Sequence, residues 1–205
     1  KVVILCGGLG NRFRAVRGDI PKSMASIQGV PFIDLLLNDL IDQGFRRFIL
    51  ATGHLGAQLE DHIKQRSDAD YIISCEPTPL GTGGAIKFAE KHIRSKQILI
   101  LNGDSRIIFY FPSLLEFHSK KKADMSILLS SFTKGDDYGN VQLNEEQRIT
   151  VFTEKPEKNE FCKKFTLVNT GVYCLNYSLL TSIEPEIKYS IEIDWIPSVI
   201  KSFFV

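Results

Sequence analysis

Two short stretches decide the fold: LCGGLGNRFR at residues 5–14 and PKSM at residues 21–24. A short apolar strand, Lys1 to Cys6, runs directly into a glycine-rich loop that is followed by cations. The members of this loop are Gly7, Gly8, Gly10, Arg12, Arg14 and Lys22. Glycines let the backbone pass close to a bulky anion and present its N–H groups, and the cations can neutralise a polyphosphate. The sequence therefore predicts a phosphate-binding loop at the end of the first strand.

The spacing excludes two familiar phosphate loops. A P-loop places Lys and Ser or Thr directly after its last glycine, but Asn11 and Arg12 follow Gly10. A dinucleotide-binding turn needs a third glycine where Phe13 stands, which argues against a nucleotide-dependent oxidoreductase. We therefore predict a long loop over a nucleotide, held by side-chain cations as well as by backbone.

Length and composition set the class of protein. The 205 residues fit one domain, and 43% hydrophobic with 24% charged residues is typical of a globular protein. A net charge of +1 argues against a nucleic-acid partner, and no apolar segment suggests a membrane partner. The four cysteines show no metal-ligand spacing; Cys6 and Cys174 are expected in the core, and a reduced, cytoplasmic setting is expected. The chain ends in an apolar run, so we expect a missing C-terminal tail.

The pattern of elements predicts an α/β fold. In the first half, apolar strands alternate with helices; the expected elements are strand 1–6, helix 31–43, strand 48–52, helix 56–65, strand 71–74, helix 83–93 and strand 98–101. The second half has strand-like runs at 125–132, 141–143, 149–153 and 166–175. We predict a Rossmann-like, mostly parallel or mixed sheet with helices on both faces.

Polar clusters follow the first-half strands, where ligands bind in such sheets. Segment 76–84, EPTPLGTGG, is either a rigid connector that opens a helix or a wall whose backbone groups read a flat base. Asn102-Gly103-Asp104 is either a capped turn or the place where a carboxylate binds Mg²⁺, and the neighbouring phosphate loop favours the metal. His54 also stands at a strand end, where it either touches a base or caps the strand.

Three further clusters lie in the second half: Tyr138-Gly139, Glu154-Lys155-Pro156 and Asn169-Thr170-Gly171. Their side chains can hydrogen-bond sugar hydroxyls or a sugar phosphate. Taken singly, each such cluster is more often a surface pair or a turn. No Ser/His/Asp set is recognisable.

Taken in order, the motifs LCGGLGNRFR, PKSM, EPTPLGTGGAI, LNGDS, DYGNV, FTEKP and VNTGVY resemble the sugar 1-phosphate nucleotidyltransferases, which make nucleotide sugars. The resemblance runs over almost the whole chain and implies a single domain over 1–205. The nucleotide half would be about 1–110 and the sugar half about 111–205. Heptose and mannose 1-phosphate guanylyltransferases are the most similar subgroup, with GTP and D-glycero-D-manno-heptose 1-phosphate as first choices. Such nucleotide sugars supply cell-surface polysaccharides.

The resemblance also implies roles for particular residues. The nucleotide would be bound by Leu5, Gly7, Gly8, Gly10, Asn11, Glu76, Gly81 and Thr82. Arg12 would hold the β- and γ-phosphates, Lys22 would contact the α-phosphate, and Asp104 would bind Mg²⁺. The sugar 1-phosphate would be held by Gly139, Glu154, Lys155 and Asn169.

Departures from the family pattern leave an alternative open. Asn11, Phe13 and Ser23 stand where the family usually has Thr, Leu and Pro. The second metal carboxylate of the family has no counterpart before Val205, because Asp194 is expected to open a helix over 195–201. The alternative is a catalytically impaired regulatory subunit that binds a nucleotide sugar. The sequence leaves base, sugar and homo-oligomerisation open.

Overall fold

The computed structural model describes residues 1–7, 20–53, 55–132, 140–154, 166–202 and 205. Its centre is an eight-stranded sheet that runs through both halves of the chain. The strands are β1 (Val2–Leu5), β4 (Arg47–Thr52), β5 (Asp70–Cys75), β6 (Gln97–Asn102), β7 (Met125–Phe132), β8 (Asn140–Leu143), β9 (Ile149–Thr153) and β10 (Thr166–Asn176). A separate hairpin pairs β2 (Ser26–Ile27) with β3 (Val30–Pro31).

The sheet changes direction in its middle. The order is β5-β4-β1-β6-β10-β8-β9, with β7 also paired to β10. The first four strands are parallel, and every later pairing, beginning with β6 and β10, is antiparallel. We call β1, β4, β5 and β6 the parallel half and β7 to β10 the antiparallel half. The predicted mixed α/β sheet is confirmed.

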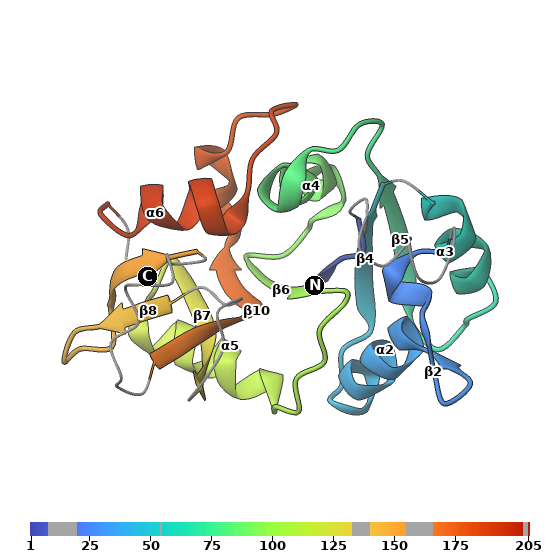
Figure 1. Ribbon diagram of the computed structural model, residues 1–205, viewed down its shortest axis with the longest axis horizontal. Helices are drawn as coiled ribbons and strands as arrows, with labels where there is room; N and C mark the ends of the chain where they lie inside the picture. Colours follow the sequence, from blue (N-terminus) through green and yellow to red (C-terminus); the bar gives the residue numbers. More distant parts are fainter. Residues whose placement is uncertain (8–19, 54, 133–139, 155–165, 203–204) are drawn as a thin grey trace.

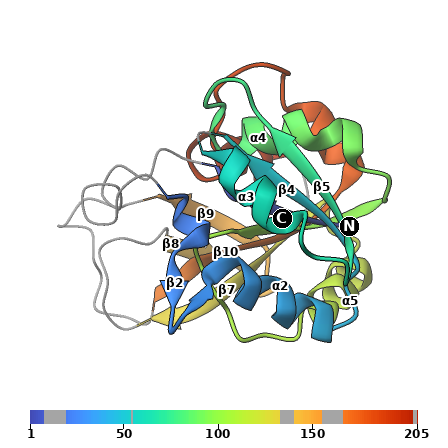
Figure 2. The same ribbon diagram turned by 90° about the vertical axis from the view of Figure 1, so that its right-hand side faces the viewer.

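Helices cover both faces of the sheet, as predicted. The α-helices are α2 (Phe32–Asp42), α3 (Gly56–Ile63), α4 (Gly81–Ala89), α5 (Phe111–Lys121) and α6 (Ile196–Val199). The short helices are η1 (Lys22–Met24), η2 (Glu90–His92), η3 (Tyr177–Ser182) and the π-helical η4 (Ile191–Trp195). Figure 1 shows α4 and α6 on one side of the sheet and α2 and α5 on the other. Figure 2 shows the same two layers from the side of the edge strand β5.

Alternation along β1 builds the two cores. Val2 and Ile4 pack with α2, α3 and α5, whereas Val3 packs with α4, η3, η4 and α6 on the opposite face. Because successive side chains of a strand point to opposite faces, a fully apolar strand must be covered on both sides. Cys174 is buried as predicted, Cys6 packs against the core, and Cys162 lies outside the described residues.

Two predicted helix boundaries were wrong. The helix expected at residue 83 begins at Gly81, whose positive φ of 75° turns the chain into it. Asp194 does not open a helix over 195–201. The turn begins at Ser190, whose hydroxyl accepts the N–H groups of Glu192 and Ile193 (3.2 Å each), and Asp194 lies inside it. The N-cap at Ser190 therefore fixes this helix. No helix of the described residues has the length and apolar character needed to cross a membrane.

Candidate active site

Backbone hydrogen bonds extend the parallel half beyond its strands and bring the polar clusters to one edge. The N–H of Cys6 donates to Ala51 O (2.8 Å), that of Glu76 to Thr52 O (2.9 Å), and that of Gly103 to Leu5 O (2.9 Å). The carboxyl ends of β1, β4, β5 and β6 therefore form one continuous edge. The described parts of these clusters lie at this one edge; the crevice that the sequence predicts there stays a prediction.

Lys22 and Asp104 meet at this edge as an ion pair between side chains 82 positions apart. Lys22 is placed by η1, in which Met24 N donates to Pro21 O (2.9 Å) and Ser23 is buried. Asp104 follows β6 directly. Both side chains remain partly exposed, at 52% and 38%, so a ligand can reach them. An exposed cation and carboxylate placed side by side are suited to binding a phosphate together with a metal ion.

The turn before Asp104 has no room for a side chain. A Cβ on Gly103 would lie 2.8 Å from Leu5 O and 2.9 Å from the Cys6 thiol. Burial raises the pKa of the Cys6 thiol to about 12, and the nearby Asp104 carboxylate adds to the rise while Ser23 opposes it. A thiol with such a pKa stays protonated near neutral pH and is a poor nucleophile. Cys6 thus shapes the edge and supplies no reactive group.

Glu76 is the buried carboxylate of the site. It is only 9% exposed, and burial raises its pKa, while the N–H of Leu80, which donates to Oε2 (3.3 Å), works against the rise. Its Oε1 lies beside two glycines: a Cβ on Gly53 would be 3.0 Å from it, and a Cβ on Gly7 would be 3.6 Å from it. Within the described residues this oxygen accepts no hydrogen bond. This oxygen is therefore able to accept a hydrogen bond from a further donor.

The glycines at the start of α4 serve packing. The N–H groups of Gly83 and Gly84 both donate to Tyr189 O (2.8 and 3.1 Å), and Tyr189 N donates to Leu80 O (2.8 Å). A Cβ on Gly81 would lie 2.7 Å from the same carbonyl oxygen. Because Tyr189 occupies these groups, the N–H groups of Gly83 and Gly84 do not read a base edge. Of the two interpretations of this segment, the rigid connector describes them.

A hydrogen-bonded chain organises the antiparallel half. Asn169 donates to the hydroxyl of Tyr173 (2.8 Å), and that hydroxyl donates to Glu192 Oε1 (3.0 Å). Tyr173 is fully buried, and burial together with the charge of Glu192 raises its pKa well above the usual value. Glu154 lies close enough to add to this rise. The predicted sugar ligands Glu154 and Asn169 are thus brought to one place.

Glu192 joins the two halves of the site. Its Oε2 accepts from the hydroxyls of Thr82 and Ser190 (3.0 Å each), while Thr82 also accepts the N–H of Ile191 (2.8 Å). Glu154, Ser190 and Glu192 line a cavity of about 420 Å³. Thr82, expected to bind nucleotide, therefore links α4 to η4. The cavity offers two carboxylates and a hydroxyl, the groups that bind a polyhydroxylated ligand.

A second link runs from β6 to a bend in β10. Gly171 has a φ of 76°, and a Cβ there would lie 2.3 Å from the side-chain nitrogen of Asn102. The register of β10 shifts between Asn169 and Tyr173, and the N–H of Gly171 donates to the Asn169 side chain (3.0 Å). Glycine at position 171 therefore leaves room for the Asn102 side chain against the bend of β10.

Six predicted site residues lie outside the described residues: Gly8, Gly10, Asn11, Arg12, Gly139 and Lys155. His54 does so as well. The sequence analysis missed Tyr173, Ser190 and Glu192. A signal for the last two exists, since Ser190 begins a turn with acidic residues two and four positions later. The N–H of Ser190 donates to Asp194 (2.8 Å), as in a reciprocal helix cap.

The donor set fits a hard cation that is held mainly by its substrate. Asp104 supplies one exposed carboxylate, and the described residues contain no group of three or more His, Cys, Asp or Glu that could hold a metal by themselves. Mg²⁺ keeps several waters and is commonly bound by one or two carboxylates plus substrate phosphates. Asp104 is therefore suited to Mg²⁺ that arrives with a nucleotide.

Comparison with known protein families decides the class. Residues 1–200 match the family described as Nucleotidyl transferase. The chain belongs to this family. It is 33% identical over 197 residues to D-glycero-alpha-D-manno-heptose 1-phosphate guanylyltransferase of Aneurinibacillus thermoaerophilus, covering 96% of this chain and 83% of the relative. It is also 29% identical to mannose-1-phosphate guanylyltransferase of Mycobacterium tuberculosis, covering 97% of this chain and 55% of that protein.

Solved structures agree with this assignment. HddC from Yersinia pseudotuberculosis complexed with GMP-PN superposes with a TM-score of 0.82 at 32% identity, covering 96% of this chain and 84% of HddC. The inositol-1-phosphate CTP transferase from T. maritima gives a TM-score of 0.81 at 19% identity, covering 99% and 82%, and shares the fold. The protein is a sugar 1-phosphate nucleotidyltransferase by family, and its fold is that of the nucleotide-sugar transferases.

Proposed function

We propose that the protein joins GTP to D-glycero-D-manno-heptose 1-phosphate, releasing pyrophosphate and forming a GDP-sugar. Mannose 1-phosphate is the second sugar choice. The observation that carries the reaction class is the Lys22–Asp104 ion pair, with the buried Glu76 at the same edge of the sheet. The relatives that are named as heptose and mannose guanylyltransferases support the choice of base and sugar.

The reaction needs no nucleophilic side chain. A phosphate oxygen of the sugar 1-phosphate attacks the α-phosphorus of GTP, the bond to the β-phosphate breaks, and pyrophosphate leaves with the electron pair. Lys22 would neutralise charge at the α-phosphate, and Arg12 would bind the β- and γ-phosphates. Mg²⁺ held at Asp104 would supply further charge neutralisation when bound. Catalysis then consists of positioning and electrostatic stabilisation.

Glu76 is our proposed reader of guanine. A carboxylate only accepts hydrogen bonds, and the Watson–Crick edge of guanine offers two adjacent donors, N1–H and N2–H₂. The edges of adenine, cytosine and uracil each place an acceptor beside a donor. One carboxylate oxygen would then face an acceptor of the base, which is unfavourable because neither atom can donate. The Oε1 of Glu76 lies beside Gly7 and Gly53 and accepts no hydrogen bond from the part of the chain that the structure describes, which supports this role. The hydroxyls of the sugar would be bound by Glu154, Asn169 and Glu192.

A pyrophosphate-release assay tests the proposal. Purified protein with Mg²⁺ is given each of the four nucleoside triphosphates in combination with heptose, mannose or glucose 1-phosphate. We expect turnover with GTP and heptose 1-phosphate above all other pairs. Silence across the panel, with nucleotide binding retained in calorimetry, would instead support the regulatory-subunit alternative.

The Glu76→Gln variant tests the base assignment separately. A glutamine amide both donates and accepts, so it mismatches guanine and matches the other bases. We expect the kcat/KM ratio of GTP over UTP to fall by about tenfold to a hundredfold, the range for one mismatched hydrogen-bonding group. The control is Glu90→Gln, whose partner Lys87 lies on α4 away from the edge. An unchanged GTP preference in Glu76→Gln would remove Glu76 as the reader.

A further inference from the structure

A groove lies at the opposite edge of the sheet, where β6 begins and β10 ends. Segments 93–96 and 176–178 line a cavity of about 620 Å³. A neighbouring cavity of about 490 Å³ shares Ser95, Lys96 and Asn176 with it, so the two form one groove. A volume of this size is in the range of small-molecule sites, roughly 300–1,000 Å³. None of the proposed catalytic residues lines it.

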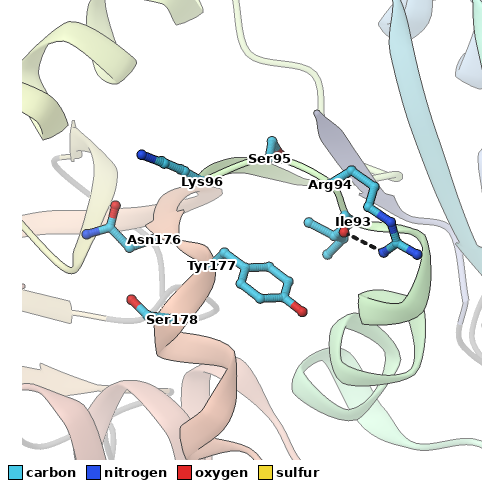
Figure 3. A pocket seen from close by; sticks show the side chains of 7 residues that line it. All are labelled: Ile93, Arg94, Ser95, Lys96, Asn176, Tyr177 and Ser178. Atoms are coloured by element: carbon cyan, nitrogen blue, oxygen red, sulfur yellow. Dashed lines mark hydrogen bonds between the residues drawn. The ribbon is translucent and has the colours of Figure 1, made fainter.

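The groove offers cations, hydroxyls and an aromatic ring. Figure 3 shows the ring of Tyr177 reaching from one wall toward Ile93 and Arg94 on the other. The Arg94 guanidinium makes one hydrogen bond, to its neighbour Ile93 O (2.9 Å). Within the described residues, its remaining N–H groups, the Lys96 ammonium and the Tyr177 hydroxyl have no partner. These are donors and a flat surface for a ligand that carries phosphate and a ring.

Positive charge concentrates on one wall. Segment 91–96 reads Lys-His-Ile-Arg-Ser-Lys and contains no carboxylate. The Lys1 side chain also reaches this segment, donating to His92 O (2.7 Å). Burial lowers the pKa of His92, and the cations of Lys91, Lys1 and Arg94 lower it further. The wall is therefore electropositive against a chain whose net charge is only +1.

Both walls are connected to the active site by rigid elements. Segment 93–96 follows α4 and η2 directly, and α4 begins at Gly81 and Thr82 at the opposite edge of the sheet. The other wall continues into η3, where Ser182 accepts the indole N–H of the buried Trp195 (2.8 Å). Trp195 ends η4, which carries Glu192. Lys87 of α4 donates to Leu180 O of η3 (3.0 Å) and ties the two paths together.

We propose that this groove binds a nucleoside diphosphate, with its phosphates on Arg94 and Lys96 and its base against Tyr177, and that its occupancy alters the active site through α4 and η3. The binding part is independent of the proposed function. The coupling follows from geometry: the two walls lead to Thr82 and Glu192, which are hydrogen-bonded to each other in the site (3.0 Å). A ligand that changes the spacing of the walls therefore acts on that bond.

Equilibrium dialysis with labelled GDP, ADP, UDP and CDP tests the binding. We expect at least one of these probes to occupy a second site per chain besides the active site. The Arg94→Gln/Lys96→Gln double variant should lose the second site by about tenfold or more in affinity, since it removes two charge-assisted contacts. Tyr177→Ala should weaken the same site, and Lys22→Ala should affect only the other site. Lys120→Gln, on the exposed end of α5, removes a positive charge away from the groove and is the control.

Two results would overturn the binding proposal: no binding of any of the four probes, or binding of which no part is weakened in the double variant. Melting curves of each variant confirm that it folds. These readouts need no turnover, so a failed activity assay does not affect them.

Titration of GTP with and without saturating diphosphate tests the coupling. Competition at the active site alone would weaken GTP binding equally in the wild type and in the double variant. In the wild type, we expect the diphosphate to change the apparent dissociation constant of GTP beyond the effect of competition. The double variant and Lys87→Met should each reduce this additional change. An identical response in all three proteins would overturn the coupling.

Discussion

The two halves of the sheet build the site in different ways. In the parallel half, each polar cluster directly follows its own strand, and backbone ladder bonds such as that from Gly103 N to Leu5 O align the clusters (2.9 Å). In the antiparallel half, the polar residues lie at unrelated positions of β9, β10 and η4. There, side-chain bonds from Asn169 through Tyr173 to Glu192 assemble them. The polar clusters of the parallel half can therefore be located in the sequence from each strand separately. Those of the antiparallel half depend on contacts between distant segments.

The difference also predicts what each half tolerates. Lys22 and Asp104 are partly exposed and contribute little to stability, because a half-exposed ion pair is screened by water. Glu192 and Tyr173 are tied into a buried network, where an unsatisfied group is costly. Substitutions in the parallel edge should change activity without unfolding the protein, and substitutions in the antiparallel network should change both.

Lys22→Ala should give the largest effect. We expect kcat to fall by about 10²- to 10³-fold, the usual cost of removing one group that stabilises charge in the transition state. The free energy of unfolding should change by less than about 1 kcal/mol. Pyrophosphate release and urea unfolding measure the two quantities, with Lys64→Ala, directly after α3, as the control. Turnover within about threefold of the wild type would show that Lys22 is no catalytic residue.

Gly171→Ala tests the junction between the halves. The added Cβ would lie 2.3 Å from the Asn102 side chain at a φ of 76°, so we expect a loss of about 3 kcal/mol in the free energy of unfolding. Gly29→Ala is the matched control: its φ is 87°, but nothing lies within 4 Å of the added atom. Its cost should be about 1 kcal/mol, from backbone strain alone. Equal losses in urea unfolding would show that the Asn102 contact does not matter.

Glu192→Gln tests the network of the antiparallel half. The substituted amide keeps one acceptor and turns the other into a donor, which faces hydroxyls that now donate to Glu192. We expect a loss of about 1–2 kcal/mol in stability and a KM for the sugar 1-phosphate raised by about tenfold. Glu184→Gln, which is exposed beyond η3, should change neither. A raised KM for GTP alone would place Glu192 on the nucleotide side instead.

His118 should give the smallest effect, and only at acidic pH. It is buried between Ser126 (3.0 Å) and Asn176 (3.3 Å), and burial lowers its pKa, although Asn176 and Asp124 partly oppose the shift. The unfolded chain therefore binds the proton more tightly. The stabilisation is complete above about pH 6.5, the ordinary value for histidine, and declines as the pH falls below it.

The His118→Gln variant isolates this contribution. Between pH 7.5 and pH 5, the free energy of unfolding of the wild type should fall by up to about 1 kcal/mol more than that of the variant. Urea unfolding at each pH measures both values. Parallel curves for the two proteins would mean that His118 does not titrate in this range.

The parts predicted from sequence have a common physical reason. Short continuous apolar runs such as 98–101, bounded by polar residues, are typical of buried strands, and the residues after them meet at one edge when the strands are parallel. That placed Glu76 and Asp104 together without any contact being known. The second half follows no such rule, because neighbouring antiparallel strands run in opposite directions. The polar residues that follow them therefore need not lie at the same edge of the sheet. The cap at Ser190 is different, because the acidic residues two and four positions later are a local signal for it, and the expectation that Asp194 opens a helix was wrong.

The sequence by itself determined the alternation of strands and helices and the membership of a nucleotidyltransferase family. It also determined which glycines and cations residues 5–24 contain. These depend on local composition and spacing, which short-range physics controls. Only the tertiary structure decided that Tyr189 would occupy the N–H groups of Gly83 and Gly84, and that Glu192 would join Thr82 to Tyr173. Such bonds join residues up to 110 positions apart in the chain, so their partners are chosen by packing and not by local pattern.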